Sequence, residues 1–264
     1  MASAAARPVG VFDSGVGGLS ILRALRTELP AEDFVYFADA GFAPYGERGD
    51  AYVTGRTRAV VQQLRSDHAI KALVIACNTA TAATVHLIRT EHPDLPLVGV
   101  EPALEPAVAL SRTRRIGVMA TRGTLGSAKF AALRDSLAGQ AHFVLQPCDG
   151  LADAIQNGDA PKIEALCARY VQAMEPFGSR TGEIDTLVLG CTHYPFAADQ
   201  IARRAGPGVR LLETGEPVAR QARRLLEAAG MLGPPAGGGS VQLVGTGSLT
   251  ALHAAARRWL SLGV

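Results

Sequence analysis

The chain has 264 residues, of which 48% are hydrophobic and 19% charged, so it can bury sizeable cores and does not have the composition of a disordered protein. Its 26 basic and 24 acidic residues give a net charge of +2, which provides no electrostatic basis for binding nucleic acid. No apolar run approaches the ~20 residues of a membrane helix, and the first residues lack the apolar core of a signal peptide, so we expect neither membrane association nor export.

Short apolar runs alternate with longer helical patterns along the chain. The expected strands are Val9–Asp13, Phe34–Ala38, Leu73–Ala76, Leu97–Val100, Ile116–Met119, His142–Leu145, Leu187–Gly190, Arg210–Leu212 and Val241–Val244. The stretches between them that predict helices include Leu19–Leu29, Arg58–His68, Pro161–Met174 and Pro217–Gly230. Because several strands are continuously apolar, we expect an α/β fold with mainly parallel sheets, flanked by helices and buried on both faces.

Two pairs of similar segments indicate an internal repeat. PVGVFDSG at Pro8–Gly15 is similar to RIGVMATRG at Arg115–Gly123, and LVIACNTA at Leu73–Ala80 is similar to LVLGCTHY at Leu187–Tyr194. Both pairs occur in the same order and at nearly the same separation. We therefore predict two pseudo-symmetric α/β domains, formed by residues 1–97 plus 207–264 and by residues 98–206.

Polar residues follow several of the expected strands. In open α/β sheets, ligands bind outside the carboxyl ends of the strands. The residues at such ends are Asp13, Ser14, Cys77, Asn78, Thr121, Cys191 and His193. If the two halves face each other, these side chains converge on one cleft between the domains.

The four cysteines are of two kinds. Cys148 and Cys167 do not combine a strand end with a polar cluster, and we interpret them as buried hydrophobic residues. Cys77 and Cys191 each end an apolar run and precede Asn-Thr or Thr-His, a setting in which a thiol can reach solvent and react. Four widely spaced cysteines without a CxxC pair do not fit a disulfide framework or a closed zinc site, so we expect a reduced, cytoplasmic protein without a metal.

Two thiols in matching settings favour proton transfer over other uses of cysteine. A single nucleophile leaves the second thiol unexplained, a disulfide is opposed by a reducing cytosol, and a metal site of Cys77, Cys191 and His193 lacks a dense ligand cluster. Inverting a stereocentre by deprotonation requires an acid/base group on each face of the carbon. His193 is the candidate partner of Cys191, because residues i and i+2 share a face of a strand, with an ordinary surface or core histidine as the alternative. Asp13 is the candidate partner of Cys77, with a helix cap as its alternative role.

The loop DSGVGG, at Asp13–Gly18, has two interpretations. Its glycines lie between a strand and a helix, and Asp39 follows 21 residues after Gly18, as in a dinucleotide fingerprint; the chain would then be a nucleotide-binding oxidoreductase. However, the third glycine position is Ser20, and Asp13 would place negative charge near a pyrophosphate. We therefore favour a loop whose amides, with Ser14, hold a carboxylate at the helix N-terminus. None of the three lysines ends an apolar run beside a polar cluster, so a pyridoxal Schiff base is disfavoured and no cofactor is expected.

With these residues in view, the chain resembles the glutamate racemases of the cofactor-independent aspartate/glutamate racemase superfamily. The matching stretches are GVFDSGVGGLSILRAL, APYGER, LVIACNTATA, VGVEPALEPAV, IGVMATRGTLGS and LVLGCTHYPF, which run in family order from Pro8 to about Phe196. The resemblance implies two α/β domains with the active site between them. It also implies interconversion of L- and D-glutamate, which supplies D-glutamate for peptidoglycan, and a homodimer.

The resemblance also implies roles for particular residues. By motif position, Cys77 and Cys191 are the acid/base pair, assisted by Asp13 and His193 respectively. The residues implied in substrate binding are Asp13, Ser14, Pro44, Tyr45, Gly46, Cys77, Asn78, Thr79, Thr121, Thr124, Cys191, Thr192 and His193. Many members carry an auxiliary Glu where Gln156 stands here, with Asp153 nearby, and a glutamine cannot act as a base.

Two further alternatives stay open beside the oxidoreductase. An aspartate or broad-specificity amino-acid racemase would differ only in the details that set side-chain length. A two-lobed small-molecule binder of the periplasmic type would share the architecture, although the missing export signal counts against it.

Overall fold

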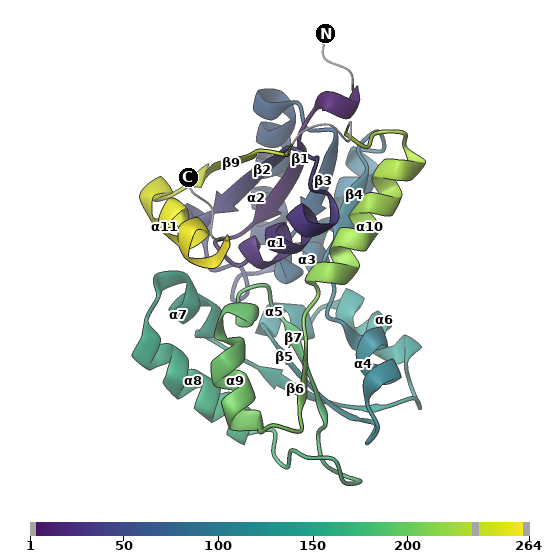
Figure 1. Cartoon of the computed structure of the whole chain (residues 1–264), viewed down its shortest axis with the longest axis vertical. Coiled ribbons are helices and arrows are strands. Elements are labelled where there is room, and N and C mark those ends of the chain that lie inside the picture. Colours follow the sequence, from purple (N-terminus) through teal and green to yellow (C-terminus); the bar gives the residue numbers. More distant parts are fainter. Residues whose placement is uncertain (1–3, 234–237, 261–264) are drawn as a thin grey trace. The chain divides into compact units, whose positions relative to one another are not determined.

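The computed structural model describes residues 4–233 and 238–260, which form two α/β units (Figure 1). Unit 1 comprises Met1–Val100 and Gly215–Val264, and unit 2 comprises Glu101–Thr214. These boundaries differ from the expected ones, because residues 98–100 were expected in the second domain and residues 207–214 in the first. Strand β8 (Arg210–Leu212) pairs in parallel with β7 (Thr186–Gly190), and this pairing places it in the sheet of unit 2.

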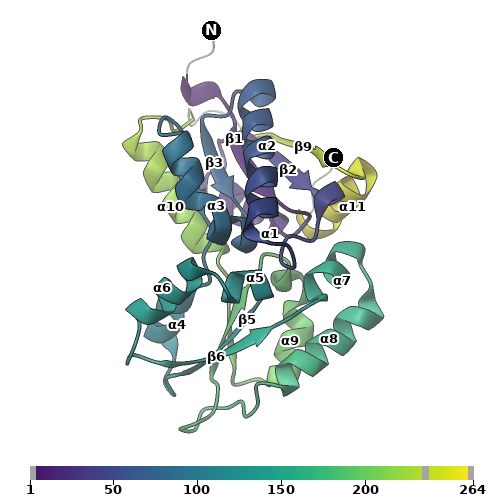
Figure 2. The same cartoon turned by 180° about the vertical axis from the view of Figure 1, so that it is seen from behind.

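Unit 1 is built on a parallel sheet with the strand order β4-β3-β1-β2-β9. The strands are β1 (Val9–Asp13), β2 (Phe34–Asp39), β3 (Ala72–Ile75), β4 (Leu97–Gly99) and β9 (Val241–Thr246). Helices α1 (Leu19–Glu28), α10 (Gly215–Ala228) and α11 (Leu249–Leu260) lie on one side of this sheet, and α2 (Asp50–His68) and α3 (Asn78–Glu91) cover the opposite face (Figures 1 and 2). Short 3-10 turns occur at η1 (Ala4–Ala6) and η2 (Ala40–Phe42). Every residue of β1, β2 and β3 is buried, as expected for parallel strands covered on both faces.

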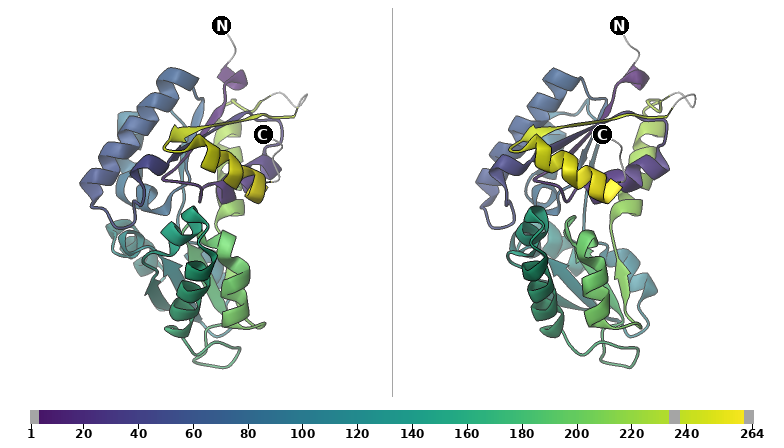
Figure 3. Two further views of the ribbon diagram at one scale, coloured as in Figure 1. Left: turned by 90° about the vertical axis from the view of Figure 1, so that its left-hand side faces the viewer. Right: turned by 60° about the vertical axis from the view of Figure 1, so that its left-hand side comes forward.

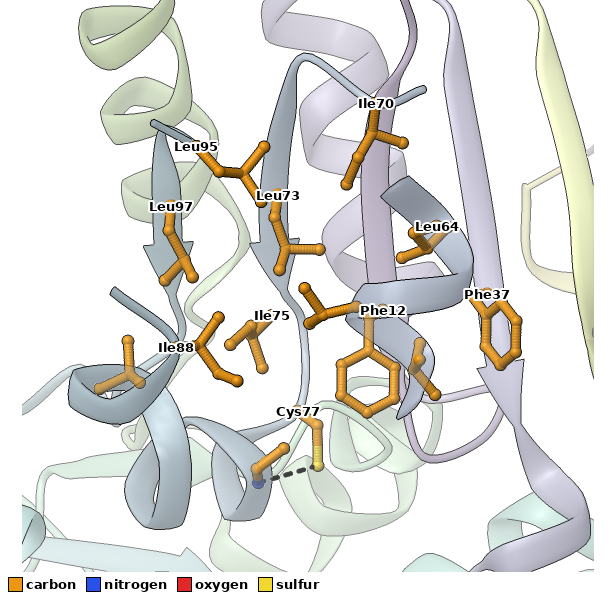
Figure 4. Close-up of a cluster of buried hydrophobic side chains, with 14 of the residues drawn as sticks. Phe12, Phe37, Leu64, Ile70, Leu73, Ile75, Cys77, Ile88, Leu95 and Leu97 are labelled. Atoms are coloured by element: carbon orange, nitrogen blue, oxygen red, sulfur yellow. Dashed lines mark hydrogen bonds between the residues drawn. The ribbon is translucent and has the colours of Figure 1, made fainter. Parts of the chain in front are cut away.

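The core between the sheet of unit 1 and helices α2 and α3 extends to the edge at which the strands have their carboxyl ends. Alternate strand residues such as Phe12, Leu73 and Ile75 point into this core and are fully buried. Figure 4 shows that Cys77 lies at the border of the same cluster, beside the first turn of α3. The thiol is therefore attached to a close-packed region rather than to a free loop.

Unit 2 has a parallel sheet with the order β6-β5-β7-β8. Strands β5 (Arg115–Ala120) and β6 (His142–Pro147) join β7 and β8 in this sheet. The helices of unit 2 are α4 (Leu104–Leu110), α5 (Arg122–Leu125), α6 (Ala128–Ser136), α7 (Leu151–Asn157), α8 (Ala160–Gln172) and α9 (Ala198–Ala205). A 3-10 turn, η3 (Tyr194–Ala197), precedes α9. Met119 and Leu189 face the core formed with α7, α8 and α9, whereas Val118 and Val188 face the core formed with α4 and α6. Successive residues of one strand thus supply both cores.

The two sheets share one strand order. The sequence β4-β3-β1-β2 in unit 1 corresponds to β8-β7-β5-β6 in unit 2, with Cys77 after β3 and Cys191 after β7. Unit 1 carries β9 and α11 in addition, and Figure 3 shows α11 following β9. The predicted fold class, two similar α/β units with parallel sheets flanked by helices, is confirmed. Among the described residues, no helix combines the length and the apolar character that crossing a membrane requires.

Candidate active site

Cys77 lies where β3 passes into α3, at the carboxyl edge of the unit 1 sheet. It is the N-cap of α3, and its Sγ accepts a hydrogen bond from the Ala80 amide at 3.4 Å (Figure 4). Asp13 ends the neighbouring strand β1, and the Ala76 amide donates to the Phe12 carbonyl at 2.7 Å. The parallel pairing of β1 with β3 therefore brings the two chain segments that carry Asp13 and Cys77 to the same edge.

The Asp13 carboxylate is fully buried and organises the glycine loop. Its Oδ1 accepts from the Ser14 amide at 2.8 Å, and its Oδ2 accepts from the Gly18 amide at 2.5 Å. The expectation that the loop amides hold a ligand carboxylate is thus wrong for Ser14 and Gly18, since these amides bind a carboxylate of the chain itself. A Cβ at Gly18 would lie 2.7 Å from the Cβ of Asp13 and 3.0 Å from Tyr36 Oη, so only glycine allows this close approach.

A chain of hydrogen bonds connects the thiol of Cys77 to Asp13. The thiol donates to Ser14 Oγ at 3.7 Å, and the Ser14 hydroxyl donates to Asp13 Oδ1 at 3.5 Å. Burial, and next the negative charge of Asp13, raise the pKa of Cys77 from 9.0 to about 12, against the opposing effect of the hydrogen bonds with Ala80 and Ser14. Cys77 therefore rests as a thiol, with a route for its proton towards a carboxylate.

The first turn of α3 contains a donor that the protein does not use. Asn78 is only 4% exposed, and its Nδ2 is buried without a hydrogen-bond partner. Thr79 is buried beside it. An unpaired buried amide costs about 1–3 kcal/mol, and a ligand oxygen that accepts from it would recover that cost. Asn78 is thus a donor suited to an anionic ligand next to Cys77.

The loop Pro44–Gly46 is held by a second buried carboxylate. Tyr45 Oη donates to Asp39 Oδ2 at 2.5 Å, Arg56 forms two hydrogen bonds to the same carboxylate at 2.9 Å each, and Thr246 Oγ1 donates to Asp39 Oδ1 at 2.8 Å. Tyr45 is buried against the ring of Phe12, whereas Pro44 and Gly46 are half-buried. Because both oxygens of Asp39 already have protein partners, the residue that the dinucleotide interpretation assigned to a ribose is committed to this loop.

Cys191 occupies the equivalent position in unit 2, directly after β7. The structure places His193 Nδ1 3.9 Å from Cys191 Sγ, and both residues are 6% exposed. His193 was expected to continue the strand and so to share a face with Cys191. In fact β7 ends at Gly190, and His193 has helical backbone angles of φ −75° and ψ −33°, so a turn rather than strand alternation brings the two side chains together.

The second ring nitrogen of His193, Nε2, contacts a side chain of α7. Gln156 Oε1 lies 3.1 Å from His193 Nε2. Asp153, the other candidate for the auxiliary position, instead accepts from Asn157 Nδ2 at 3.0 Å and pairs with Lys162 Nζ at 3.3 Å. Gln156 and not Asp153 therefore contacts the histidine.

The threonines of unit 2 follow the neighbouring strand ends. Ala120 at the end of β5 pairs in register with Gly190 of β7, so the residues after each strand leave the same edge. Thr121 Oγ1 accepts from the Thr124 amide at 3.2 Å and donates to Thr124 Oγ1 at 2.9 Å, which closes the turn into α5. Thr192 is buried between Cys191 and His193 in the chain.

All four cysteines are free and buried. Cys148 and Cys167 are 2% and 0% exposed within the core of unit 2, and burial raises the pKa of both thiols, that of Cys167 to about 11. Cys77 and Cys191, at 6% each, are hardly more exposed, so the expectation that these thiols reach solvent is wrong for this structure. Their strand-end position and their polar partners distinguish them instead. Within residues 4–233 and 238–260, no group of three His, Cys, Asp or Glu side chains is placed to hold a metal ion.

Several residues that hold the loops of the site were not predicted from the sequence. Tyr36 Oη donates to the Gly15 carbonyl at 2.6 Å, and Arg56 and Thr246 bind Asp39 as described above. Thr246 ends β9, so the strand-end rule alone could have identified it. Arg56 lies in the middle of α2, and no local pattern in the sequence marks it.

Comparison with known proteins gives a consistent result. The sequence model of the Asp/Glu/Hydantoin racemase family matches residues 10–222. The chain is 50% identical over 233 residues to a glutamate racemase of Ralstonia pickettii, which covers 88% of this chain and 80% of the relative. Its fold matches a crystal structure of glutamate racemase isoform RacE1 from Bacillus anthracis, with a TM-score of 0.85, 29% identity and coverage of 97% of this chain and 94% of the other. It also matches a Francisella tularensis glutamate racemase in complex with D-glutamate, with a TM-score of 0.82, 26% identity and coverage of 98% and 95%.

Proposed function

This chain belongs to the Asp/Glu/Hydantoin racemase family, and we propose that it is a glutamate racemase in which Cys77 and Cys191 transfer protons at the α-carbon. The observation that supports this role for the thiols is the repeated arrangement of the two units. Each places a cysteine after the corresponding strand of its sheet, and each provides that cysteine with its own polar partner. Two-base racemisation requires such a pair, because the proton must leave from one face of the carbon and return to the other.

In unit 1, Ser14 and Asp13 move the proton of Cys77. The thiol with a pKa of about 12 cannot act as a base until its proton has left. The hydrogen bonds from Cys77 to Ser14 and from Ser14 to Asp13 give that proton a path to a carboxylate. Binding of the ammonium group of glutamate near Asp13 offsets the negative charge that disfavours the thiolate. Cys77 then takes the α-proton in one direction and delivers it in the other.

In unit 2, the imidazole of His193 has the same task for Cys191. Its Nδ1 lies within reach of Cys191 Sγ, so it can accept the thiol proton and return it. Thus the two thiols depend on different partners, a hydroxyl and a carboxylate at Cys77 and an imidazole at Cys191. A positioned acid/base group of this kind contributes about 10²–10⁴-fold in rate.

The remaining polar groups at the two strand edges bind the substrate in this proposal. Asn78 offers its unpaired Nδ2 to a carboxylate oxygen, and Thr79 follows it on the same turn. The proposed binding residues of unit 1 also include Ser14, Pro44, Tyr45 and Gly46, and those of unit 2 are Thr121, Thr124 and Thr192. The solved Francisella tularensis relative in complex with D-glutamate supports glutamate as the substrate class.

A direct assay tests this function against the aspartate alternative. Purified protein, stripped of metal and free of pyridoxal phosphate and nicotinamide nucleotides, is incubated with L-glutamate or L-aspartate while optical rotation is followed. We expect glutamate to lose its rotation and aspartate to keep it. Cys77→Ser and Cys191→Ser should each nearly abolish turnover. Racemisation of aspartate alone, or a strict need for a nicotinamide nucleotide, would contradict the proposal.

Three further parts of the proposal follow from the resemblance to the family. The product D-glutamate would serve peptidoglycan synthesis, the enzyme would act in the cytoplasm, and it would form a homodimer. Static light scattering on the purified full-length chain tests the last of these, since a dimer doubles the molar mass of 27.5 kDa and a monomer does not.

A further inference from the structure

We propose that Gln156 is a positioning residue that holds His193 in its neutral Nε2–H tautomer, so that Nδ1 serves as the base for Cys191. This inference rests on the proposed function, because it assigns a role within the same proton transfer. Gln156 acts through the histidine ring, because its Oε1 contacts His193 Nε2.

The contact between Gln156 and His193 determines which ring nitrogen carries hydrogen. Gln156 Oε1 lies 3.1 Å from His193 Nε2, and an amide oxygen can only accept a hydrogen bond. The hydrogen must therefore be on Nε2. A neutral imidazole has a single N–H group, so Nδ1 presents its lone pair on the side of Cys191 Sγ, 3.9 Å away. With the opposite tautomer, an N–H group would face the thiol and could not take its proton.

The position of Gln156 on α7 explains how the contact is held. Leu151, Ala154 and Ile155 of the same helix are buried in the core of unit 2, which fixes the helix against η3, the turn that follows His193. Gln156, adjacent to Ile155, is half-buried. The side chain is thus presented from a packed helix, as a group that orients an imidazole must be.

The chemical type of this partner matters as much as its position. A carboxylate beside Nε2 would stabilise the imidazolium and retain the proton on the ring, whereas an amide provides only a dipole. On α7 the nearby carboxylate of Asp153 is paired with Lys162. On the thiol side of the ring lies Cys191, whose charge, after burial, raises the pKa of the neighbouring Tyr194 hydroxyl; that hydroxyl donates to the Cys148 carbonyl at 3.4 Å.

The step can be written with its atoms balanced. The Cys191 S–H bond breaks and an N–H bond forms at His193 Nδ1, which gives a thiolate beside an imidazolium. Reversal of the same step restores the thiol and the neutral ring. Because Gln156 carries no charge, it does not draw the proton away from this pair, and Cys191 can act as base or acid in turn.

Nitrogen-15 spectroscopy of labelled histidine measures the tautomer directly. The His193 signals are identified among the six histidines by comparison with His193→Asn. In the wild-type protein at neutral pH, we expect Nε2 to give the shift of a protonated nitrogen and Nδ1 that of an unprotonated one. Gln156→Leu should produce a mixture of tautomers and lower kcat/KM by roughly tenfold, the lower end of the loss found when the residue that orients a metal-bound histidine is removed. Since enantiomers have equal free energies, this loss must be the same for L- and D-glutamate.

Gln156→Glu tests the chemical type, because it keeps the shape and adds a carboxylate. The imidazolium of His193 should then persist to higher pH than in the wild type, because the carboxylate stabilises the charged ring and raises its pKa. Asn157→Asp is the matched control. It adds the same charge one residue further along α7. The wild-type Asn157 side chain donates to Asp153 there and not to His193, so this substitution should leave the tautomer and kcat/KM unchanged.

The outcomes separate this inference from the proposed function. If the wild-type protein racemises glutamate but carries its hydrogen on Nδ1, or if Gln156→Leu changes neither the tautomer nor kcat/KM, the role of Gln156 is refuted and the racemase stands. If the tautomer is as expected but the wild type does not racemise glutamate, the proposed function fails instead.

Discussion

Replacing Asp13 with asparagine should make Cys77 a stronger acid. The negative charge of Asp13 is the second largest cause, after burial, of the high pKa of this thiol. A rise from 9.0 to about 12 corresponds to roughly 4 kcal/mol in favour of the protonated form, so that near pH 8 only about one Cys77 in ten thousand is a thiolate. Asp13→Asn removes the charge but keeps burial, so the pKa should fall while staying above 9.0. Each unit of that fall raises the thiolate fraction about tenfold.

The rate of alkylation by iodoacetamide, followed by mass spectrometry of the peptide that contains Cys77, measures this change. Ser14→Ala is the control of opposite sign, because the hydrogen bond with Ser14 lowers the pKa of the thiol. Both substitutions affect the glycine loop. If they only made Cys77 more accessible to iodoacetamide, alkylation would therefore be faster in both variants. We expect acceleration in Asp13→Asn and slowing in Ser14→Ala. Equal acceleration in both, or an unchanged rate in Asp13→Asn, would refute the electrostatic argument.

Three further substitutions test the surroundings of the site. Asn78→Ala should raise the KM for glutamate by about ten- to hundredfold, without lowering the thermal melting temperature, because its buried Nδ2 has no partner to lose. Lys71→Met should destabilise unit 1 by about 3–5 kcal/mol, because the buried carboxylate of Glu32 loses its cation and, among the described residues, keeps only the hydrogen bond from the Gly233 amide. Urea unfolding, followed by the fluorescence of the single tryptophan in α11 of unit 1, measures this loss. Gly18→Ala should cost about 1–3 kcal/mol in the same assay and also lower turnover, since its Cβ would push Asp13 aside; unchanged activity would show that the position of Asp13 is not critical.

The strands were predictable because their signal is local. Each predicted strand is present, and the ends differ by at most two residues, as at β6, which continues to Pro147 instead of ending at Leu145. Continuous apolar runs bounded by polar or glycine residues mark buried parallel strands without knowledge of their neighbours. The repeated cysteine segments also predicted the equivalence of β3 and β7, which the common strand order of the sheets confirms.

Features that depend on the partners of a residue were not predictable in the same way. The assignment of residues 207–214 to the first domain was wrong, because a three-residue strand carries no mark of the sheet that it joins. The exposure of Cys77 and Cys191 was overestimated, since each thiol packs into the hydrophobic cluster of its own unit, with side chains from distant parts of the sequence. The amides of the DSGVGG loop were assigned to a ligand, whereas Asp13 at the start of the same motif binds two of them.

The contact between Gln156 and His193 shows the same limit within the site. The two residues are 37 apart in sequence, and only the packing of α7 against η3 brings them together. The sequence identified both Asp153 and Gln156 as candidates for one auxiliary position. The choice between them follows from the helix geometry, which turns Asp153 towards Lys162.

The fate of the α-hydrogen in heavy water tests the two-thiol mechanism most directly. L-glutamate is incubated with the enzyme in deuterium oxide and stopped at low conversion, and the α-deuterium content of each enantiomer is measured after separation. Delivery by a second, solvent-exchanged thiol predicts that the D-glutamate formed is fully deuterated while the remaining L-glutamate still carries protium. D-glutamate that retains the original hydrogen would show that a single group carries the proton from one face to the other, and would contradict the mechanism.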